Sequence, residues 1–376
     1  KFVITGDGAS LLSLEPGSTF TLSASNIDNQ TGMIVTPYKF ILGSVGKVAY
    51  TSSVATNIGS TENATMFGTT GGVISLTSTA SLISTGNNTV GVGVNGPKDS
   101  TVSYIAGPYE VTNAGNISLT GDKSTGIYVK GGAKALNSAG VNMISMGTNS
   151  AGMYAEGLDS IVQNDGNIEI STNSVGLYSS AVKSVLTEAG VINNGSITAK
   201  EITPGVFATD VTGIYVTLGS EGYQKGGTLE FTGNGSTGIF NQGNFKMSGG
   251  TVTLGSLGGV AVYSKGASSN TEISNGTINV SDGSVALYAD GSTITVSGGT
   301  FDIGTEGLLM YNYPSGGVGT AGQLKIMNAT TATIHNGGMA FYVEGQDLTG
   351  ISGVLNSLVS SSSTGTMFLD MENGSS

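Results

Sequence analysis

The chain has 376 residues, with 62 glycines, 6 prolines and no cysteine or tryptophan. Glycine without a three-residue period, combined with so little proline, excludes collagen, and a hydrophobic content of 38% excludes a disordered low-complexity chain. All thirteen basic residues are lysine and the net charge is −12, which excludes nucleic acid as an expected partner and removes the arginine fork that clamps phosphates.

The missing cysteines exclude disulfides and thiolate metal sites, so we expect packing and backbone hydrogen bonds to hold the fold. No run approaches the ~18 to 20 apolar residues of a membrane helix. The sequence starts at Lys1 in the middle of a pattern, without a charged-then-apolar signal segment, so we expect a mature fragment. We expect no cofactor and no metal.

Residues 1–114 form the less regular N-terminal part of the chain. Gly17 precedes an alternation of Phe20 and Leu22, and Gly72 precedes a similar one, so we expect coils with larger loops. Two segments, 37–40 and 97–109, place proline beside aromatic residues, and proline is excluded from interior strand ladders. We predict that both are loops with partner-binding side chains, namely Tyr38, Lys39, Phe40, Tyr104 and Tyr109.

A motif recurs about every 25 residues through 115–349. It starts as Gly-x-apolar-x-apolar, as at 115–119, and ends in Gly-Ile-Tyr, as at 126–128; a third apolar alternation, such as Ile161-Val162, fills the gap. Strands this short, with period-two alternation and no helical periodicity, must stack to bury their apolar faces. The repeat predicts an all-β fold, a single right-handed parallel β-helix with three short strands per coil of about 25 residues.

The end of each motif assigns the faces of its strand. The position before the aromatic residue is apolar in every repeat, and alternate residues of a strand point to opposite sides, so we expect that position inside and the aromatic outside. We interpret the aromatic column as rings that stack coil on coil, and a sugar-stacking stripe is the alternative. The column comprises Tyr128, Tyr154, Tyr178, Tyr215, Phe240, Tyr263, Tyr288, Tyr311 and Tyr342.

Two excursions interrupt the repeat. The aromatic spacing stretches between Tyr178 and Tyr215 across a segment with Pro204 and Phe207, and a second excursion follows Tyr311 and contains Tyr313. Insertions in a solenoid become loops on a rigid scaffold, where binding residues concentrate. Phe207 and Tyr313 therefore join the partner-binding candidates; the alternative is that each ring covers the base of its own loop. We expect residues 350–376 to form a truncated C-terminal coil.

Motifs for catalysis are weak. Two Gly-x-Gly-x-x-Gly segments, at 91–96 and 233–238, lack the following helix that a dinucleotide site needs. His335 is the only histidine, no Gly-x-Ser-x-Gly elbow occurs, and we interpret His335 as a turn residue. The calcium-binding nonapeptide of some β-helices is also missing from the sequence. We therefore expect no enzyme, although a polysaccharide-degrading β-helix enzyme stays as a distant alternative.

The motif running from Gly115 to Tyr128 resembles the passenger repeats of fusobacterial type V autotransporter adhesins, and the resemblance covers residues 115–342. It implies a virulence-associated passenger on the bacterial cell surface, anchored through a C-terminal outer-membrane barrel that this chain does not contain. It also implies attachment to host cells and to other bacteria through a host receptor protein or a galactose-type glycan. A purely structural stalk that spaces a distal binding tip is the alternative.

Overall fold

The computed structural model describes residues 2–4, 12–14, 19–22, 27–29, 39–53, 55–60, 62–98, 109–140, 143–184, 188–255, 257–281, 283–313, 322–343 and 363–371. Side chains before residue 51 are not part of that description. The chain divides into two compact units, unit 1 (Lys1–Lys200) and unit 2 (Glu201–Ser376), which are treated in turn.

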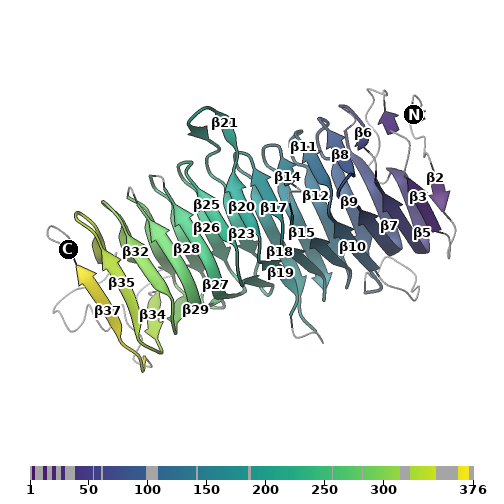
Figure 1. Ribbon diagram of the computed structural model, residues 1–376. Helices are drawn as coiled ribbons and strands as arrows, with labels where there is room; N and C mark the ends of the chain where they lie inside the picture. The colour runs from purple at the N-terminus through teal and green to yellow at the C-terminus, as the bar shows by residue number, and fades with distance from the viewer. Residues whose placement is uncertain are drawn as a thin grey trace. The chain divides into compact units, whose positions relative to one another are not determined.

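Within the described ranges, every regular element is a β-strand (Figure 1). The strands of unit 1 are β1 (Phe2–Ile4), β2 (Leu12–Leu14), β3 (Thr19–Leu22), β4 (Ile27–Asn29), β5 (Lys39–Ser52), β6 (Ala55–Asn57), β7 (Ala64–Leu76), β8 (Ser81–Ser84), β9 (Val90–Asn95), β10 (Tyr109–Asn113), β11 (Asn116–Leu119), β12 (Thr125–Lys130), β13 (Lys134–Asn137), β14 (Met143–Met146), β15 (Ala151–Leu158), β16 (Ile161–Asn164), β17 (Asn167–Ile170), β18 (Val175–Val182), β19 (Gly190–Asn193) and β20 (Ser196–Ala199).

The strands of unit 2 are β21 (Glu201–Thr203), β22 (Val206–Phe207), β23 (Thr212–Val216), β24 (Glu221–Gln224), β25 (Thr228–Phe231), β26 (Thr237–Asn241), β27 (Asn244–Leu254), β28 (Val260–Lys265), β29 (Asn270–Val280), β30 (Val285–Asp290), β31 (Thr293–Val296), β32 (Thr300–Ile303), β33 (Leu308–Tyr313), β34 (Gln323–Ile326), β35 (Thr330–Ile334), β36 (Met339–Val343) and β37 (Met367–Met371).

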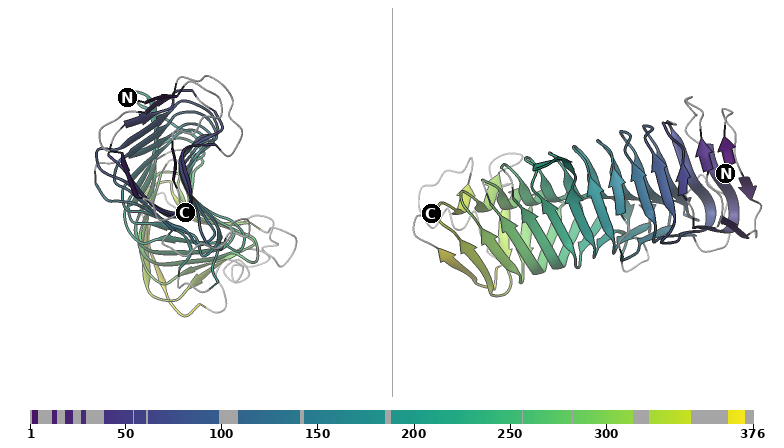
Figure 2. Two further views of the ribbon diagram at one scale, coloured as in Figure 1. Left: turned by 90° about the vertical axis from the view of Figure 1, so that its right-hand side faces the viewer. Right: turned by 45° about the horizontal axis from the view of Figure 1, so that its top comes forward.

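In unit 1 three parallel ladders define the turns. β10 pairs with β13 and then β16, β11 pairs with β14 and then β17, and β12 pairs with β15 and then β18. Each turn thus supplies one strand to each ladder, and the right-hand view of Figure 2 shows strands of successive turns side by side. The solenoid has about 26 residues per turn and about 10 turns, which confirms the predicted parallel β-helix with three strands per coil.

Unit 2 repeats the arrangement, and two of its strands, β27 and β29, have 11 residues each. β27 contributes to two ladders, since its first half pairs with β24 and its second half with β25. The register between β27 and β29 shifts at Met247/Ser248 and again at Ser248/Thr251, where the chain turns the corner between ladders. A continuous strand therefore replaces two short ones here.

The predicted interior column is confirmed. Its members in unit 1, Ile127, Met153 and Leu177, have no exposed surface, and Ile214 to Met310 continue the same pattern in unit 2. Phe341, at the end of the column, is only half-buried. Full burial of such side chains contributes about 1.5–3 kcal/mol each, which identifies this column as a main source of stability.

At Gly152, the glycine before the interior Met153, the next turn approaches the backbone closely. A Cβ on Gly152 would lie 2.6 Å from the carbonyl oxygen of Gly176 and 2.7 Å from Cγ2 of Ile168. These distances are shorter than van der Waals contact with backbone that the ladder holds in place. Glycine thus permits the close packing of this turn, whereas later turns carry Ala261, Ala286 and Leu309 at the same position.

A buried asparagine ladder is a feature that the sequence analysis did not identify. Asn113 donates to Oδ1 of Asn137 at 2.8 Å, Asn137 to Asn164 at 2.7 Å, and Asn164 to Asn193 at 2.8 Å. All four side chains are fully buried. Because buried amides are costly unless hydrogen-bonded, each turn depends on its neighbour to satisfy this position.

Candidate functional site

The N-terminal loop prediction is only partly testable. Tyr38 and Tyr104 lie outside the described residues. Lys39 and Phe40 do not lie in a loop, because they form the first residues of β5, where Lys39 pairs with Ala64 and Phe40 with Thr65. Proline restricts only its own position in the ladder, so a strand begins two residues after Pro37.

The prediction of Tyr109 as a loop residue is wrong. It is the first residue of β10, pairs with Gly72 of β7, and is only 9% exposed. Tyr109, Val111 and Asn113 alternate as the inward residues of this strand, so the ring belongs to the core. The strand starts directly after Pro108 in the sequence, so a proline does not by itself place the next aromatic residue in a loop.

The excursion at 200–207 is confirmed as a protruding element. β21 and β22 form an antiparallel hairpin, with Glu201 paired to Phe207 and Thr203 to Val206. Its turn is Pro204-Gly205, and Gly205 has φ of +78°, as expected for a proline-initiated type II turn. The Gly205 amide donates to Oε1 of Glu201 at 2.7 Å, which ties the tip to its base. Figure 1 shows β21 extending beyond the neighbouring strands of unit 2.

The hairpin presents aliphatic side chains to solvent. Ile202 is 50% exposed and Val206 56% exposed, whereas Phe207 is half-buried. Phe207 is therefore the less exposed residue of β22, and its ring is not displayed as fully as Val206. Ile202 and Val206 are the large hydrophobic side chains that the hairpin exposes, and the sequence analysis did not single them out.

Tyr313 lies at the end of β33 and is 37% exposed. Its ring meets Tyr288 edge-on, with centroids 6.5 Å apart, and its backbone pairs with Asp290. Phe207 pairs through β22 only with β21, so the structure places these two candidates on separate ladders. The predicted residues of unit 2 consequently do not form one site.

The aromatic column is confirmed as stacked and outward-facing. In unit 1 the Tyr128 and Tyr154 centroids are 5.3 Å apart, and those of Tyr154 and Tyr178 are 4.8 Å apart. In unit 2 Tyr263 and Tyr288 are 4.4 Å apart with an interplanar angle of 6°. The unit 1 pairs meet edge-on and the Tyr263–Tyr288 pair meets face to face, so the rings contact one another from turn to turn. This geometry favours coil-to-coil contact over a sugar-binding stripe.

Carboxylates accept hydrogen bonds from this column. Tyr128 donates its hydroxyl to Oε2 of Glu156 at 2.7 Å, and Tyr263 donates to Oδ2 of Asp290 at 3.1 Å. Burial, and then the Asp290 carboxylate, raise the pKa of Tyr263 well above its ordinary value of 10.0. Burial likewise raises the pKa of Tyr154. These phenols therefore remain protonated hydrogen-bond donors in the folded chain.

His335 lies in the turn after β35, as the sequence analysis predicted. Its Nε2 atom is 2.6 Å from Oδ1 of Asp302, and both side chains are more than a third exposed. Among the described residues, no group of three or more histidine, cysteine, aspartate or glutamate side chains is arranged to hold a metal ion. The pair is thus a surface contact between neighbouring turns.

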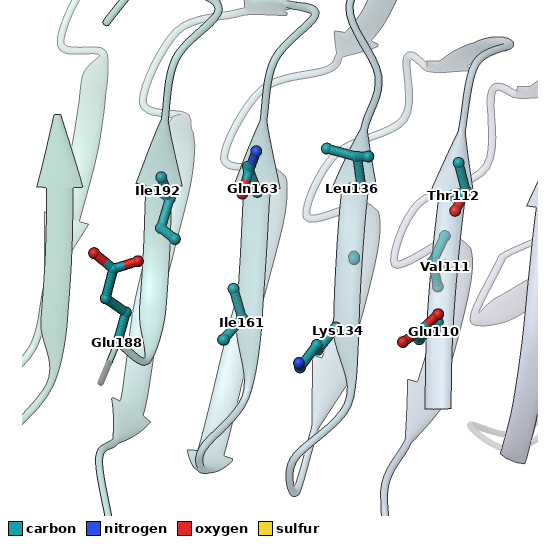
Figure 3. A pocket seen from close by; sticks show the side chains of 10 residues that line it. Glu110, Val111, Thr112, Lys134, Leu136, Ile161, Gln163, Glu188 and Ile192 are labelled. Carbon is teal, nitrogen blue, oxygen red and sulfur yellow. The ribbon is translucent and has the colours of Figure 1, made fainter. Parts of the chain in front are cut away.

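A groove of about 370 Å³ lies on the outward side of unit 1, across β10, β13, β16 and β19 (Figure 3). Register places Glu110 beside Lys134 and Lys134 beside Ile161, and it places Leu136 beside Gln163. These outward residues form two rows across the strands. The lining residues are Glu110, Val111, Thr112, Lys134, Ala135, Leu136, Ile161, Gln163, Glu188 and Ile192.

The groove combines polar acceptors with an apolar floor. Gln163 donates Nε2 to both carboxylate oxygens of Asp165, at 2.9 and 3.0 Å, which leaves its amide oxygen outside that contact. Ile192 is only 5% exposed and forms part of the floor. The sequence analysis missed this groove, because its residues belong to different turns and meet only once the register is known.

Comparison of the chain with protein-family models, curated proteins and solved structures gives no significant match. Within the described part of the chain, no helix is long and apolar enough to cross a membrane.

Proposed function

We propose that the chain is part of a bacterial cell-surface adhesin, an autotransporter passenger that attaches the cell to host cells and to other bacteria. The observation that carries the proposal is the β21–β22 hairpin, which interrupts a regular solenoid and displays Ile202 and Val206. Such a protrusion on a stacked scaffold suits partner contact, because its backbone is already ordered before binding. The resemblance of residues 115–342 to fusobacterial adhesin repeats supports the same function.

Repetition supports this mode of action. A solenoid carries contact elements at fixed positions, so several weak contacts act together once one of them forms. In this proposal the partner is a host receptor protein or a galactose-type glycan, and the passenger is held at the outer membrane by a barrel beyond this chain. No step of the mechanism requires catalysis.

Attachment of chain-coated beads to human epithelial cells tests the proposal. Beads that carry residues 1–376 should attach, free chain should displace them, and beads whose segment 202–206 is replaced by Gly-Ser residues should attach less. Displacement by free galactose would identify a glycan partner. Attachment equal to that of uncoated beads would contradict the proposal and favour the stalk.

The enzyme alternative has its own assay. A polysaccharide-degrading β-helix would release new sugar ends from acidic glycans in the presence of calcium. We expect no release, and sustained turnover would overturn the adhesin proposal in favour of catalysis.

A further inference from the structure

The groove of unit 1 is lined by charged side chains, whereas the hairpin exposes the aliphatic side chains of Ile202 and Val206. We infer that it binds a cationic segment of a partner polypeptide, whose lysine or arginine side chains lie across β10, β13, β16 and β19. This inference rests on the proposed function and deepens it, since it assigns a protein ligand to a second contact surface. The groove lies apart from the aromatic column, which is built on β12, β15 and β18.

Charge favours a cationic ligand. The charged residues that line the groove are Glu110 and Glu188, which are acidic, and Lys134, which is basic. Glu188 also has a partner within the chain, so Glu110 is the carboxylate that a cationic ligand meets. The whole chain has a net charge of −12, which attracts cations and repels polyanionic glycans over distances of about a Debye length, ~8 Å in physiological salt.

Hydrogen-bonding capacity points the same way. The Glu110 carboxylate and the Gln163 amide oxygen are acceptors that the donors of a bound ligand can reach. Within the described part of the chain, the Glu110 and Lys134 side chains make no hydrogen bond or ion pair, although the register sets them side by side. Ammonium and guanidinium groups supply several donors each and no acceptor.

The floor matches the stems of long basic side chains. Leu136, Ile161 and Ile192 provide aliphatic surface between the polar groups, and Figure 3 shows them between Glu188 at one end and Glu110 at the other. Lysine and arginine cover apolar surface with their methylene groups while the charged head stays in contact with polar groups. None of the described residues that line the groove is aromatic, so these residues offer no flat apolar platform on which neutral sugars stack.

Substitution of Lys134 tests whether the ligand is positively or negatively charged. If the ligand is cationic, Lys134 repels it and removal of the ammonium strengthens binding; if the ligand is anionic, the same change weakens it. Replacement of Glu110 by glutamine should weaken the binding of a cationic ligand and strengthen the binding of an anionic one. Exposed charge pairs of this kind change affinity by about two- to five-fold.

The experiment titrates the full chain into a fluorescein-labelled peptide, Lys-Leu-Lys-Leu-Lys, and follows fluorescence anisotropy at low ionic strength. We expect saturable binding that Glu110→Gln weakens about two- to five-fold and Lys134→Gln strengthens by a similar factor. Glu230→Gln on β25 and Lys325→Gln on β34 are matched controls, since both residues also lie on outward strand positions, in unit 2. These controls should leave the affinity unchanged.

Three results would overturn the inference: equal weakening by Glu110→Gln and Glu230→Gln, weaker binding after Lys134→Gln, or binding of a glucosamine pentamer or of the Glu-Leu-Glu-Leu-Glu peptide in place of the basic peptide. The peptide assay contains no cells, so its failure leaves cell attachment through the hairpin untouched. Conversely, peptide binding without cell attachment would support the groove and contradict the adhesin.

Discussion

Asn137 donates its side-chain amide to Oδ1 of Asn164 at 2.7 Å, and neither side chain has any exposed surface. Asn164 in turn donates to Asn193, and Asn193 donates to the carbonyl oxygen of Gly195, so the amides are satisfied only as a series. The stacked turns of unit 1 are therefore coupled by side chains as well as by backbone ladders.

Asn164→Ala should destabilise the chain by about 2–3 kcal/mol, because it breaks two amide contacts and leaves buried groups of Asn137 and Asn193 without their partner. Urea unfolding followed by circular dichroism measures the change. Ser118→Ala, a half-buried outward position on β11, is the control and should shift the midpoint little. Equal midpoints for the two variants would contradict the role of the asparagine ladder.

Gly152→Ala should lower the free energy of unfolding by about 1–3 kcal/mol, since the new Cβ would lie 2.6 Å from the Gly176 carbonyl oxygen. Gly93→Ala is the matched control, because its Cβ would point outward and have its nearest neighbour, Cγ2 of Thr65, at 3.6 Å. Thermal unfolding of the two variants compares them directly. A fall in Tm for Gly93→Ala as large as that for Gly152→Ala would refute the close-approach explanation.

Stability should decline at alkaline pH through the buried phenols. The pKa of Tyr263 is raised in the folded chain, so the stability that it contributes is complete below the unfolded value of about 10 and is lost as the pH rises beyond it. Urea midpoints measured from pH 8 to pH 11 should fall more steeply for the natural chain than for Tyr263→Phe. At pH 7 the two should differ only by the lost hydrogen bond to Asp290. Equal pH dependence of the urea midpoints of the two chains would contradict the raised pKa of Tyr263.

The hairpin predictions separate binding from folding. Replacing Ile202 and Val206 together by serine should leave the Tm unchanged, because both side chains are at least half exposed, while cell attachment falls. Leu218→Ser is the control: Leu218 is 69% exposed in a turn of the regular solenoid and should not affect attachment. Equal attachment by all three chains would remove the hairpin from the contact surface.

Much of the fold could be predicted because its signals repeat in the sequence. The motif ending in Gly-Ile-Tyr located β12, and the same pattern placed Met153 and Leu177 in the interior, as the structure confirms. The asparagine ladder also had a signal, since Asn137 and Asn164 are each the last residue of the corresponding strand in successive turns. Comparison of these polar columns would have identified it.

The candidate site was less predictable for a physical reason. Tyr109 was taken for a displayed residue because it follows proline, yet inward or outward direction depends on the strand register, which one proline does not reveal. Glu110 and Lys134 belong to successive turns and lie side by side only because of the strand register. The groove could not be predicted before that register was known. The excursion at 200–207 was predictable because an insertion changes the repeat length itself.

The binding isotherm of purified residues 1–376 on intact human epithelial cells, read by flow cytometry, tests the adhesin proposal most directly. The account predicts saturable binding that excess unlabelled chain abolishes and that the Ile202→Ser, Val206→Ser double variant reduces. Signal that rises linearly without saturation, or that unlabelled chain does not displace, would contradict adhesion through this part of the protein.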